Sequence, residues 1–257
     1  MSSSAFEATT PDRVSYLDRL AVTDLGRSYK RRMLDELDVR AGQTVMDVGC
    51  GPGTDLASLA EAVTPDGAVI GVDRDQKMID AARERIAGRP TVNICLGDAH
   101  DLPLADGTAD RARTDRVLQH VADPVRALDE MRRVLRPGGR LVMGEPDWNT
   151  LAIDHPDDDL SLAYTRHVAE KVIKNAGIGR RLARLATDAG FSVPTVIPVT
   201  PVFRDVQAAD KVLGLQRTTQ RAVAAGYFTA EQARHWLDHL ARGPFLAAVT
   251  FYIVVAE

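Results

Sequence analysis

Cysteine and long apolar runs are scarce in this chain of 257 residues, and it has no excess of basic charge. Its two cysteines, Cys50 and Cys95, are too few for a disulfide framework. A formal net charge of -4 argues against a nucleic-acid-binding surface, which would be basic. The longest apolar run, 245–256, is too short to span a bilayer, and the N-terminal segment lacks the apolar core of a signal peptide. We therefore expect a cytoplasmic protein with neither a nucleic-acid nor a membrane partner.

Clusters of metal-ligating residues are also missing from the sequence. His235 and His239 are one helical turn apart, as two metal ligands can be, but no third ligand is evident beside them. We therefore expect a solvated helix face there and no metal site.

The chain does contain a strand that runs into a glycine-rich turn. Residues 45–53 read VMDVGCGPG, an apolar strand followed by three alternating glycines, and a helix is expected from Thr54. Glycine tolerates positive φ and lets a ligand approach the backbone closely, so this combination makes a nucleotide-type pocket. The G-x-G-x-G spacing differs from the G-x-G-x-x-G of dinucleotide-binding turns.

Acidic residues around the turn indicate which ligand it takes. Asp47 ends the strand, and Asp55 falls in the first turn of the expected helix. A pyrophosphate prefers bare N–H groups and positive potential at a helix N-terminus, so Asp55 would oppose it. A ligand that carries an ammonium and a sulfonium tolerates these acids, which favours S-adenosylmethionine (SAM) over NAD.

Two more apolar strands end in acids. Residues 68–73 close on Asp73, about 20 residues beyond the glycines, where a ribose-binding carboxylate belongs. Leu96, Gly97 and Asp98 close the next strand. Three acid-ended strands in order are difficult to obtain by chance.

These motifs resemble the class I SAM-dependent methyltransferases, and within them the small-molecule branch typified by ubiquinone and menaquinone methyltransferases (the methyltransferase domain 11 type). The resemblance spans roughly residues 30–150. It is carried by VMDVGCGPG at 45–53, GVDRDQKMID at 71–80, GDAHDLPLADGTAD at 97–110 and VLQHVADPVRALDEMRRVLRPGGRLVMGEPD at 117–147.

The resemblance implies an α/β, Rossmann-like fold with a seven-stranded sheet in the order 3-2-1-4-5-7-6 and an antiparallel last strand. An N-terminal tail and lid helices would occupy 1–38, with Gly26 separating two helices, and the SAM-binding domain would occupy 39–257. Helical insertions at about 150–178 and 205–243 would cap the substrate pocket. Pro198 and Pro201 fit a sixth strand at the sheet edge.

The resemblance also assigns cofactor contacts. Asp47 and the glycine turn would hold the methionine end of SAM, Asp73 both ribose hydroxyls, and Asp98 and Ala99 the adenine. Met78 has core packing as an equally supported alternative. The lid tyrosines Tyr16 and Tyr29 are candidates to touch SAM or substrate, with plain core roles as the alternative. The cofactor-binding set is Tyr16, Asp47, Gly49, Cys50, Gly51, Gly53, Asp73, Arg74, Met78, Asp98, Ala99 and Thr114.

The fourth strand departs from the family pattern, because residues 111–116 read RARTDR where an apolar strand is usual. Arginine in a central strand is unfavourable unless it is paired or lies at a cleft. Arg113 and Arg116 therefore either bind acidic neighbours, with Asp115 the nearest in sequence, or point into the active site.

Candidate catalytic and substrate-binding residues follow the fourth strand and the fifth, which is expected at 140–144 with a loop after it. His120 is the best candidate for a general base, with a structural histidine as the alternative. Trp148 could stack on a flat acceptor, and Glu145 or Asp147 could orient a hydroxyl or an amine; Arg116 completes the substrate-binding set. His155 and His167 are weaker candidates for these roles.

The function expected from the resemblance is methyl transfer from SAM to a small organic acceptor, a secondary metabolite or a quinone-like molecule. Oxygen is slightly favoured over nitrogen or carbon as the methylated atom, because His120 offers a base. The alternative is a SAM-binding enzyme of the same fold that cyclises or decarboxylates its substrate. A homodimer is left open, as is the identity of the acceptor.

Overall fold

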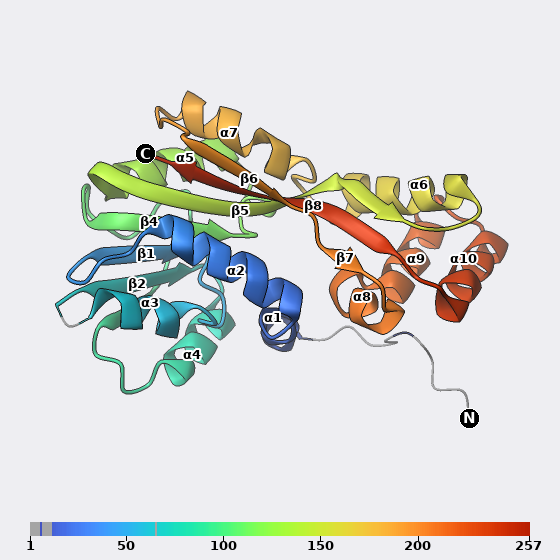
Figure 1. The fold of residues 1–257 in the computed structure, drawn as a ribbon, viewed down its shortest axis with the longest axis horizontal. Coiled ribbons are helices and arrows are strands. Elements are labelled where there is room, and N and C mark those ends of the chain that lie inside the picture. Colours follow the sequence, from blue (N-terminus) through green and yellow to red (C-terminus); the bar gives the residue numbers. More distant parts are fainter. Residues whose placement is uncertain (1–5, 7–11, 65) are drawn as a thin grey trace.

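The computed structural model describes residues 6, 12–64 and 66–257 (Figure 1). The expected N-terminal tail lies outside these residues, apart from Phe6. A long sheet runs through the whole molecule, with an α/β sandwich at one end and a group of helices at the other. The sandwich carries the sequence motifs, and the helical end is the cap.

Eight strands form one sheet in the order β3-β2-β1-β4-β5-β8-β6, with β7 paired to β8 beyond β6. The first five are parallel, and β8 is antiparallel to β5, β6 and β7. The predicted order is confirmed, with β8 as the seventh strand of the prediction and β7 as a short addition. The strands are β1 (Thr44–Val48), β2 (Ala68–Asp73), β3 (Val92–Leu96), β4 (Ala109–Asp115), β5 (Leu135–Ile153), β6 (Thr195–Val199), β7 (Val202–Phe203) and β8 (Ala247–Ala256).

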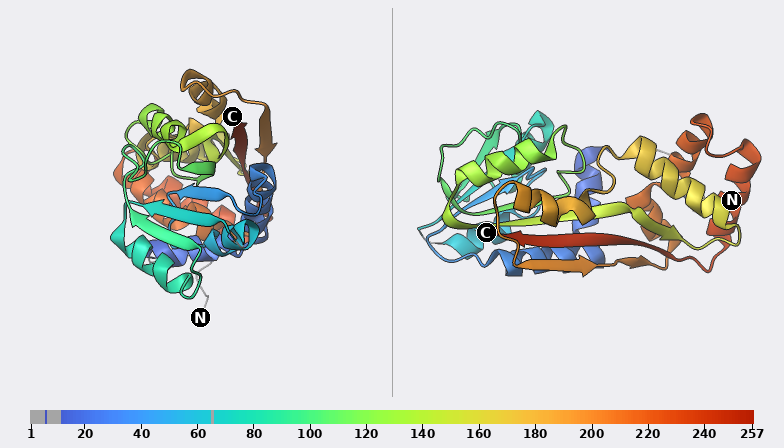
Figure 2. Two further views of the ribbon diagram at one scale, coloured as in Figure 1. Left: turned by 90° about the vertical axis from the view of Figure 1, so that its left-hand side faces the viewer. Right: turned by 90° about the horizontal axis from the view of Figure 1, so that it is seen from above.

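Helices cover both faces of the sandwich (Figure 2). One face packs against α5 (Pro124–Val134) and α7 (Ile178–Asp188), and the other against α2 (Asp24–Leu37) and α3 (Leu56–Val63). The helix α4 (Gln76–Arg85) extends the second face. This covering explains why β1 and β2 are continuous apolar runs, since strands buried on both faces have no polar side.

The lid consists of α1 (Arg13–Ala21) and α2, and it breaks four residues earlier than the sequence predicts. The break lies at Val22 and Thr23, whose hydroxyl caps α2 by accepting the N–H of Gly26 at 2.9 Å. Gly26 therefore lies inside the first turn of α2 and does not separate the helices. Glycine is required there because a Cβ would collide with the carbonyl oxygen of Leu20.

The strand β5 is much longer than the predicted segment 140–144. Its extension pairs with β8 from Glu145 to Asp147 and again at Ala152 and Ile153, with an irregularity between. Both strands thereby leave the sandwich and enter the cap (Figure 1). Glu145, Asp147 and Trp148 consequently lie within a strand, where the sequence predicts a loop.

The cap has its own apolar core, built around the fully buried Trp236 and Tyr164. It contains α6 (Asp158–His167), the π-helical segment η1 (Val168–Val172), α8 (Val206–Leu213), α9 (Leu215–Ala224) and α10 (Ala230–Arg242). A capping box begins α10, since Thr229 and Gln232 bond reciprocally. Helices therefore fill much of both segments where insertions are expected.

Candidate functional site

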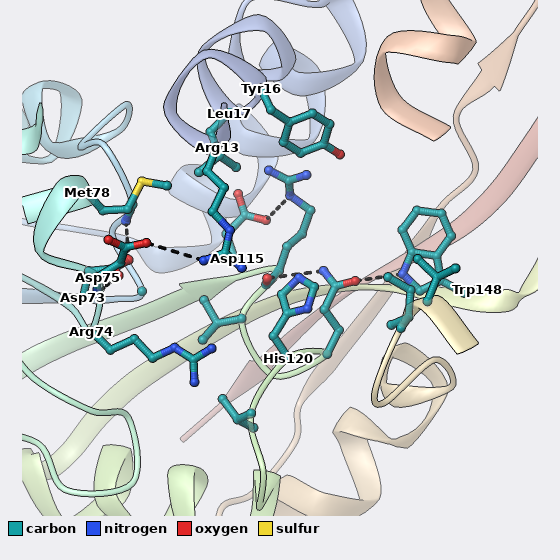
Figure 3. Close-up of a pocket in the computed structure, with 18 of the residues that line it drawn as sticks. Arg13, Tyr16, Leu17, Asp73, Arg74, Asp75, Met78, Asp115, His120 and Trp148 are labelled. Carbon is teal, nitrogen blue, oxygen red and sulfur yellow. Dashed lines mark hydrogen bonds and ion pairs between the residues drawn. The ribbon is translucent and has the colours of Figure 1, made fainter. Parts of the chain in front are cut away.

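A cavity of about 430 Å³ lies at the carboxyl ends of β1, β2 and β4, between the lid helix α1 and the cap (Figure 3). Ligands of open α/β sheets bind at this edge, where the strand order reverses on either side of β1. One end of the cavity is built by the glycine turn and β2, and the other by the cap.

Gly49 and Gly51 form the cavity wall at the end of β1. Both have positive φ, 73° and 54°, which L side chains rarely adopt. The turn lies close to β2, because the N–H of Gly49 donates to the carbonyl of Val72 at 2.7 Å. A Cβ on Gly49 would collide with Val117. The turn is thus a bare-backbone cradle, as a closely approaching ligand requires.

Asp73 ends β2 and faces this cradle. Its Oδ2 accepts the N–H of Gly51 at 2.9 Å, and its Oδ1 accepts the N–H of Asp75 at 2.9 Å (Figure 3). Each carboxylate oxygen keeps a lone pair for a further donor. The backbone therefore fixes the carboxylate while leaving it able to accept a bond from each of two ribose hydroxyls.

Four predicted adenine-side and ribose-side residues line the same end of the cavity: Arg74, Met78, Asp98 and Ala99. Met78 is buried, so it serves both as core and as cavity wall. Asp98 accepts the backbone N–H of His100 at 2.9 Å and its ring Nδ1 at 2.5 Å. These bonds hold the pKa of Asp98 below its usual value.

The ring of Tyr16, in the lid helix α1, lines the cavity (Figure 3). Its hydroxyl donates to the carbonyl of Val212 in α8 at 3.3 Å, so the lid also contacts the cap. Tyr29 lies elsewhere: it packs on Phe251 and donates to Oδ2 of Asp115 at 3.2 Å. Of the two lid tyrosines, only Tyr16 is placed to touch a ligand.

Four residues of the predicted cofactor set do not line the main cavity: Asp47, Cys50, Gly53 and Thr114. Cys50 and Gly53 belong to the glycine turn itself, and Asp47 and Thr114 are buried in the sheet. Asp47 and Cys50 line a smaller pocket beside the turn, together with Gly49 and Gly51. The contact of these four residues with SAM stays a prediction.

A buried ion cluster lies beneath the turn. Arg113, 1% exposed, reaches Asp55 at 3.0 Å, Asp115 at 3.5 Å and Asp47 at 3.6 Å. Lys30 from the lid pairs with Asp55 and, at 3.1 Å, with Asp115. Arg113 is thus paired structurally, the first of the two predicted alternatives.

The carboxylates of the cluster respond to burial and to these cations. Burial opposes ionisation of Asp55, but Arg113 and Lys30 overcome it and lower its pKa to about 2. Burial raises the pKa of Asp47 to about 6, against the attraction of Arg113. The charge of Asp55 is therefore compensated inside the protein, and the sequence argument that it faces the ligand is corrected.

Arg116 differs from Arg113, because it lines the main cavity. Its backbone has φ 57°, one of only two positive values found for non-glycine residues within the described ranges. Its Nε is buried and makes no hydrogen bond; Oδ1 of Asp115 lies 3.7 Å away. Although burial disfavours the charge, Tyr29 and Asp115 keep the pKa of Arg116 above its usual value. The guanidinium is therefore a permanent cation in the cavity wall.

His120 lies in the same wall and points into the cavity (Figure 3). The side chain is exposed to the open cavity. Even so, the surrounding protein lowers its pKa to about 4, and Arg116, Arg13 and Arg74 add to this effect. The imidazole is neutral at neutral pH, so it can accept a proton, although it is a weak base.

The three candidates of β5 separate into two groups. Glu145 and Asp147 are 0% exposed and absent from the cavity wall. Glu145 accepts the N–H of Leu118 at 2.5 Å, and Asp147 pairs with Arg180. Their assignment to the substrate is corrected, because the β5–β8 pairing encloses both. Trp148 does line the cavity, and its Nε1 donates to Gln119 at 2.8 Å.

Sequence reasoning missed the cap side of the cavity. It is mostly apolar, with two arginines from α9 and no carboxylate among its wall residues: Leu151, Tyr164, Val168, Val172, Ile173, Val212, Leu213, Gly214, Arg217, Thr218 and Arg221. No motif distinguishes these residues from ordinary helix core. Only the packing of the cap against the sandwich brings them to the cavity.

The weaker histidine candidates lie in the cap. His155 is buried and packs against His235 and His239 with ring centroids 5.4 and 4.5 Å away. The predicted solvated pair thus has a third histidine beside it. Among the described residues, no group of three or more histidine, cysteine or acidic side chains is arranged to hold a metal ion. His167 is buried against Tyr227 and does not line the main cavity.

The sequence matches a family model described as a methyltransferase domain over residues 40–189. This chain belongs to that family. The match covers the glycine turn, the acid-ended strands and the start of the cap, and it makes SAM the cofactor of this chain.

Among curated relatives, a protein of Streptomyces fradiae described as an uncharacterized 37.1 kDa protein in transposon TN4556 is 64% identical over the whole chain, which spans 74% of that protein. The demethylmenaquinone methyltransferase of Staphylococcus aureus (strain JH9) is 36% identical over 125 residues. That alignment covers 49% of this chain and 52% of the relative. The chain thus spans about half the length of the relative whose activity is named.

Solved structures show the same fold. A SAM-dependent methyltransferase from Aquifex aeolicus superposes with a TM-score of 0.57 at 19% identity, covering 95% of this chain and 98% of the other. The likeness therefore extends to the cap side of the methyltransferase as well as to the sandwich. Within the described part of the chain, no helix has the length and apolar character needed to cross a membrane.

Proposed function

We propose that this methyltransferase transfers the methyl group of SAM to a small organic acceptor bound in the cap half of the cavity. The observation that carries the proposal is the composite character of this cavity. Bare glycine backbone and Asp73 form one end, and an apolar wall from the cap forms the other. Both ends belong to one continuous space, so donor and acceptor can meet within it.

The cofactor end fits SAM on the chain's own geometry. The cradle at Gly49 has no room for a Cβ, and both oxygens of Asp73 are held in place by backbone N–H groups. SAM supplies an electrophilic methyl group on a sulfonium that leaves readily, so orienting the acceptor provides much of the rate. The protein's task is therefore to bind the acceptor, orient it and exclude water.

The acceptor end favours a molecule with a flat or polycyclic apolar body. Trp148 presents its ring to this end, with its N–H already satisfied by Gln119. Leu151, Val172 and Ile173 extend the apolar surface. A secondary metabolite or quinone-like molecule meets these requirements, because aromatic rings stack favourably on an indole.

Oxygen is the acceptor atom that we favour. His120 is neutral at neutral pH, so its imidazole can accept the proton that a hydroxyl loses. A proton acceptor is useful only where the nucleophile must be deprotonated. No observation within the cavity favours the cyclising or decarboxylating alternative.

Calorimetric titration with SAM and with S-adenosylhomocysteine tests the cofactor end. Both ligands are expected to bind in the micromolar range, and Asp73→Ala should abolish binding. Asp129→Asn, an exposed acid on α5, is the matched control and should bind as the wild type does. If neither ligand binds the wild-type chain, the proposed function fails.

A mass-shift assay tests the methyl transfer itself. The chain is incubated with SAM and a panel of phenols, enols, amines and quinols, and products are searched for a gain of one methyl group. Release of S-adenosylhomocysteine together with a methylated acceptor supports the proposal. Acceptor conversion without S-adenosylhomocysteine would instead support the cyclase or decarboxylase alternative.

A further inference from the structure

We propose that Arg116 binds the anionic form of the acceptor, and that the acceptor is therefore an acidic hydroxyl compound, a phenol or an enol. The inference rests on the proposed function and specifies its substrate class. The acceptor's O–H proton leaves to His120 or to solvent water, and the oxygen forms a bond to the methyl carbon. The bond between that carbon and sulfur breaks, and its electron pair remains on sulfur.

The charge distribution beneath the cavity leaves Arg116 without a dedicated partner. Asp115 could serve it, but Oδ2 of Asp115 already receives Lys30 at 3.1 Å, Arg113 at 3.5 Å and the Tyr29 hydroxyl at 3.2 Å. Its other oxygen is 3.7 Å from Nε of Arg116, beyond hydrogen-bond distance. Arg116 thus forms one long ion pair with Asp115, whose carboxylate also serves two closer cations.

The guanidinium accordingly has donors to offer. Nε is buried beside Asp115 and makes no hydrogen bond, whereas the exposed part of the side chain, 17% of its surface, borders the cavity. A planar, permanently charged fork of this kind suits an oxyanion better than it suits a neutral group.

The backbone at Arg116 is held in an unusual conformation by its surroundings. Its φ of 57° lies in the left-handed region, where non-glycine residues are strained. Its N–H donates to Gly144 at 2.8 Å, and its carbonyl accepts from Gln119 at 3.3 Å. Because Gln119 also receives Trp148, the side chain that binds the acceptor ring also helps to fix Arg116. Strain held in this way is characteristic of a functional position.

The neighbouring base makes an acidic acceptor necessary. His120 lines the same wall, and Arg116 is one of the charges that weaken its basicity. A weak base cannot remove the proton of an aliphatic alcohol effectively. An arginine within about 4–6 Å lowers the pKa of an acidic group by about one to three units. Arg116 and His120 can therefore operate together only on a hydroxyl that is already acidic.

The chromophore 4-nitrophenol provides a direct test, because its absorbance reports its own ionisation. It is titrated with pH while bound to the full chain in the presence of saturating S-adenosylhomocysteine. In the wild type we expect the bound probe to ionise about one to three pH units below the free probe. Arg116→Gln should remove this shift, and Arg116→Lys, which retains a charge, should restore part of it.

Arg234→Gln is the matched control. Arg234 is exposed on α10 and does not line the cavity, so its loss removes an equal charge without touching the site. The shift should survive in this variant. Thermal melting of each variant and its affinity for S-adenosylhomocysteine are measured alongside, which separates a folding defect or a lost cofactor site from a lost anion site.

Four outcomes would overturn the inference. The bound probe is no more acidic than the free probe, or it does not bind to the wild-type complex at millimolar concentration. The shift persists in Arg116→Gln. Alternatively, Arg116→Gln weakens the binding of S-adenosylhomocysteine tenfold or more, which would assign Arg116 to the cofactor site. In each case normal binding of S-adenosylhomocysteine to the wild type leaves the proposed function intact, and its absence would end both.

Discussion

The indole Nε1 of Trp148 donates to Oε1 of Gln119 at 2.8 Å, and this bond connects β5 to the segment that follows β4. The same amide donates from its Nε2 to the carbonyl of Arg116 at 3.3 Å. Trp148 is therefore both a wall of the acceptor pocket and a support for the cation that faces it. A change at this ring should affect acceptor binding before it affects the cofactor.

Tryptophan fluorescence can isolate this residue, because the chain has only two tryptophans and the other, Trp236, is buried in the cap core. In a Trp236→Phe background, quenching by 4-nitrophenol should therefore report on Trp148 alone. We expect Trp148→Ala, made in the otherwise unaltered chain, to weaken the binding of 4-nitrophenol about tenfold or more, because it removes a large stacking side chain. Calorimetry should give an unchanged affinity for S-adenosylhomocysteine. An equal loss of affinity for the probe and for S-adenosylhomocysteine would contradict a specific role of Trp148 in acceptor binding.

Glu145 should make the protein less stable as the pH rises. Burial raises the pKa of Glu145 to about 8 from an ordinary value of 4.5. The folded state thus holds a proton that the unfolded state releases, so stability falls between about pH 4.5 and 8. The loss from this group is roughly 3 kcal/mol between pH 5 and 8.

Glu145→Gln, which retains an acceptor for the N–H of Leu118, should remove that pH dependence. Denaturant unfolding at pH 5, 6.5 and 8 measures it. The stability of the variant relative to that of the wild type is expected to increase steadily as the pH rises. Parallel stability curves for the two proteins would show that Glu145 does not titrate in this range.

Arg113 should be essential to stability because it compensates several buried acids at once. Arg113→Met leaves Asp47, Asp55 and Asp115 with Lys30 as their main cation. Removing one partner of a buried ion pair destabilises a protein by about 3–5 kcal/mol. Urea unfolding should therefore show a loss of this size.

Arg136→Gln is the matched control for Arg113→Met. Arg136 pairs with Asp110 at 2.6 Å while its side chain remains 48% exposed. Exposed ion pairs contribute about 0–1 kcal/mol, so this variant should unfold nearly as the wild type does. Similar losses in the two variants would contradict the distinction between buried and surface pairs.

His120 should titrate far below an ordinary histidine. Desolvation by the surrounding protein, and then three arginines, lower its pKa to about 4, so the neutral, proton-accepting form persists down to that pH. NMR titration of the ring protons, assigned by their loss in His120→Gln, measures this value directly. Arg116→Gln should move the midpoint upward, because it removes one of the repelling charges. A wild-type midpoint near 6.5 would show that His120 is not desolvated.

The cofactor end of the site could be predicted from sequence because its determinants are local. A strand, a glycine turn and an acid at the end of the next strand are adjacent in a parallel sheet whatever else the chain does. Asp73 is the clearest example: its spacing from the glycines places it at the cavity, where the structure shows it bonded to Gly51. The sheet order was predictable for the same reason, together with Pro198, which lies in the edge strand β6.

The acceptor end depended on contacts between distant segments. Glu145 and Asp147 are buried because β8, about a hundred residues later, pairs with an extension of β5 that no local pattern reveals. Arg113 and Arg116 are alike in sequence, yet the lid's Lys30 completes a buried cluster around one while the other faces the cavity. Sequence alone predicted which backbone cradle and which carboxylate would hold SAM. Only tertiary packing decided which charges border the cavity, because burial and pairing are properties of the assembled fold.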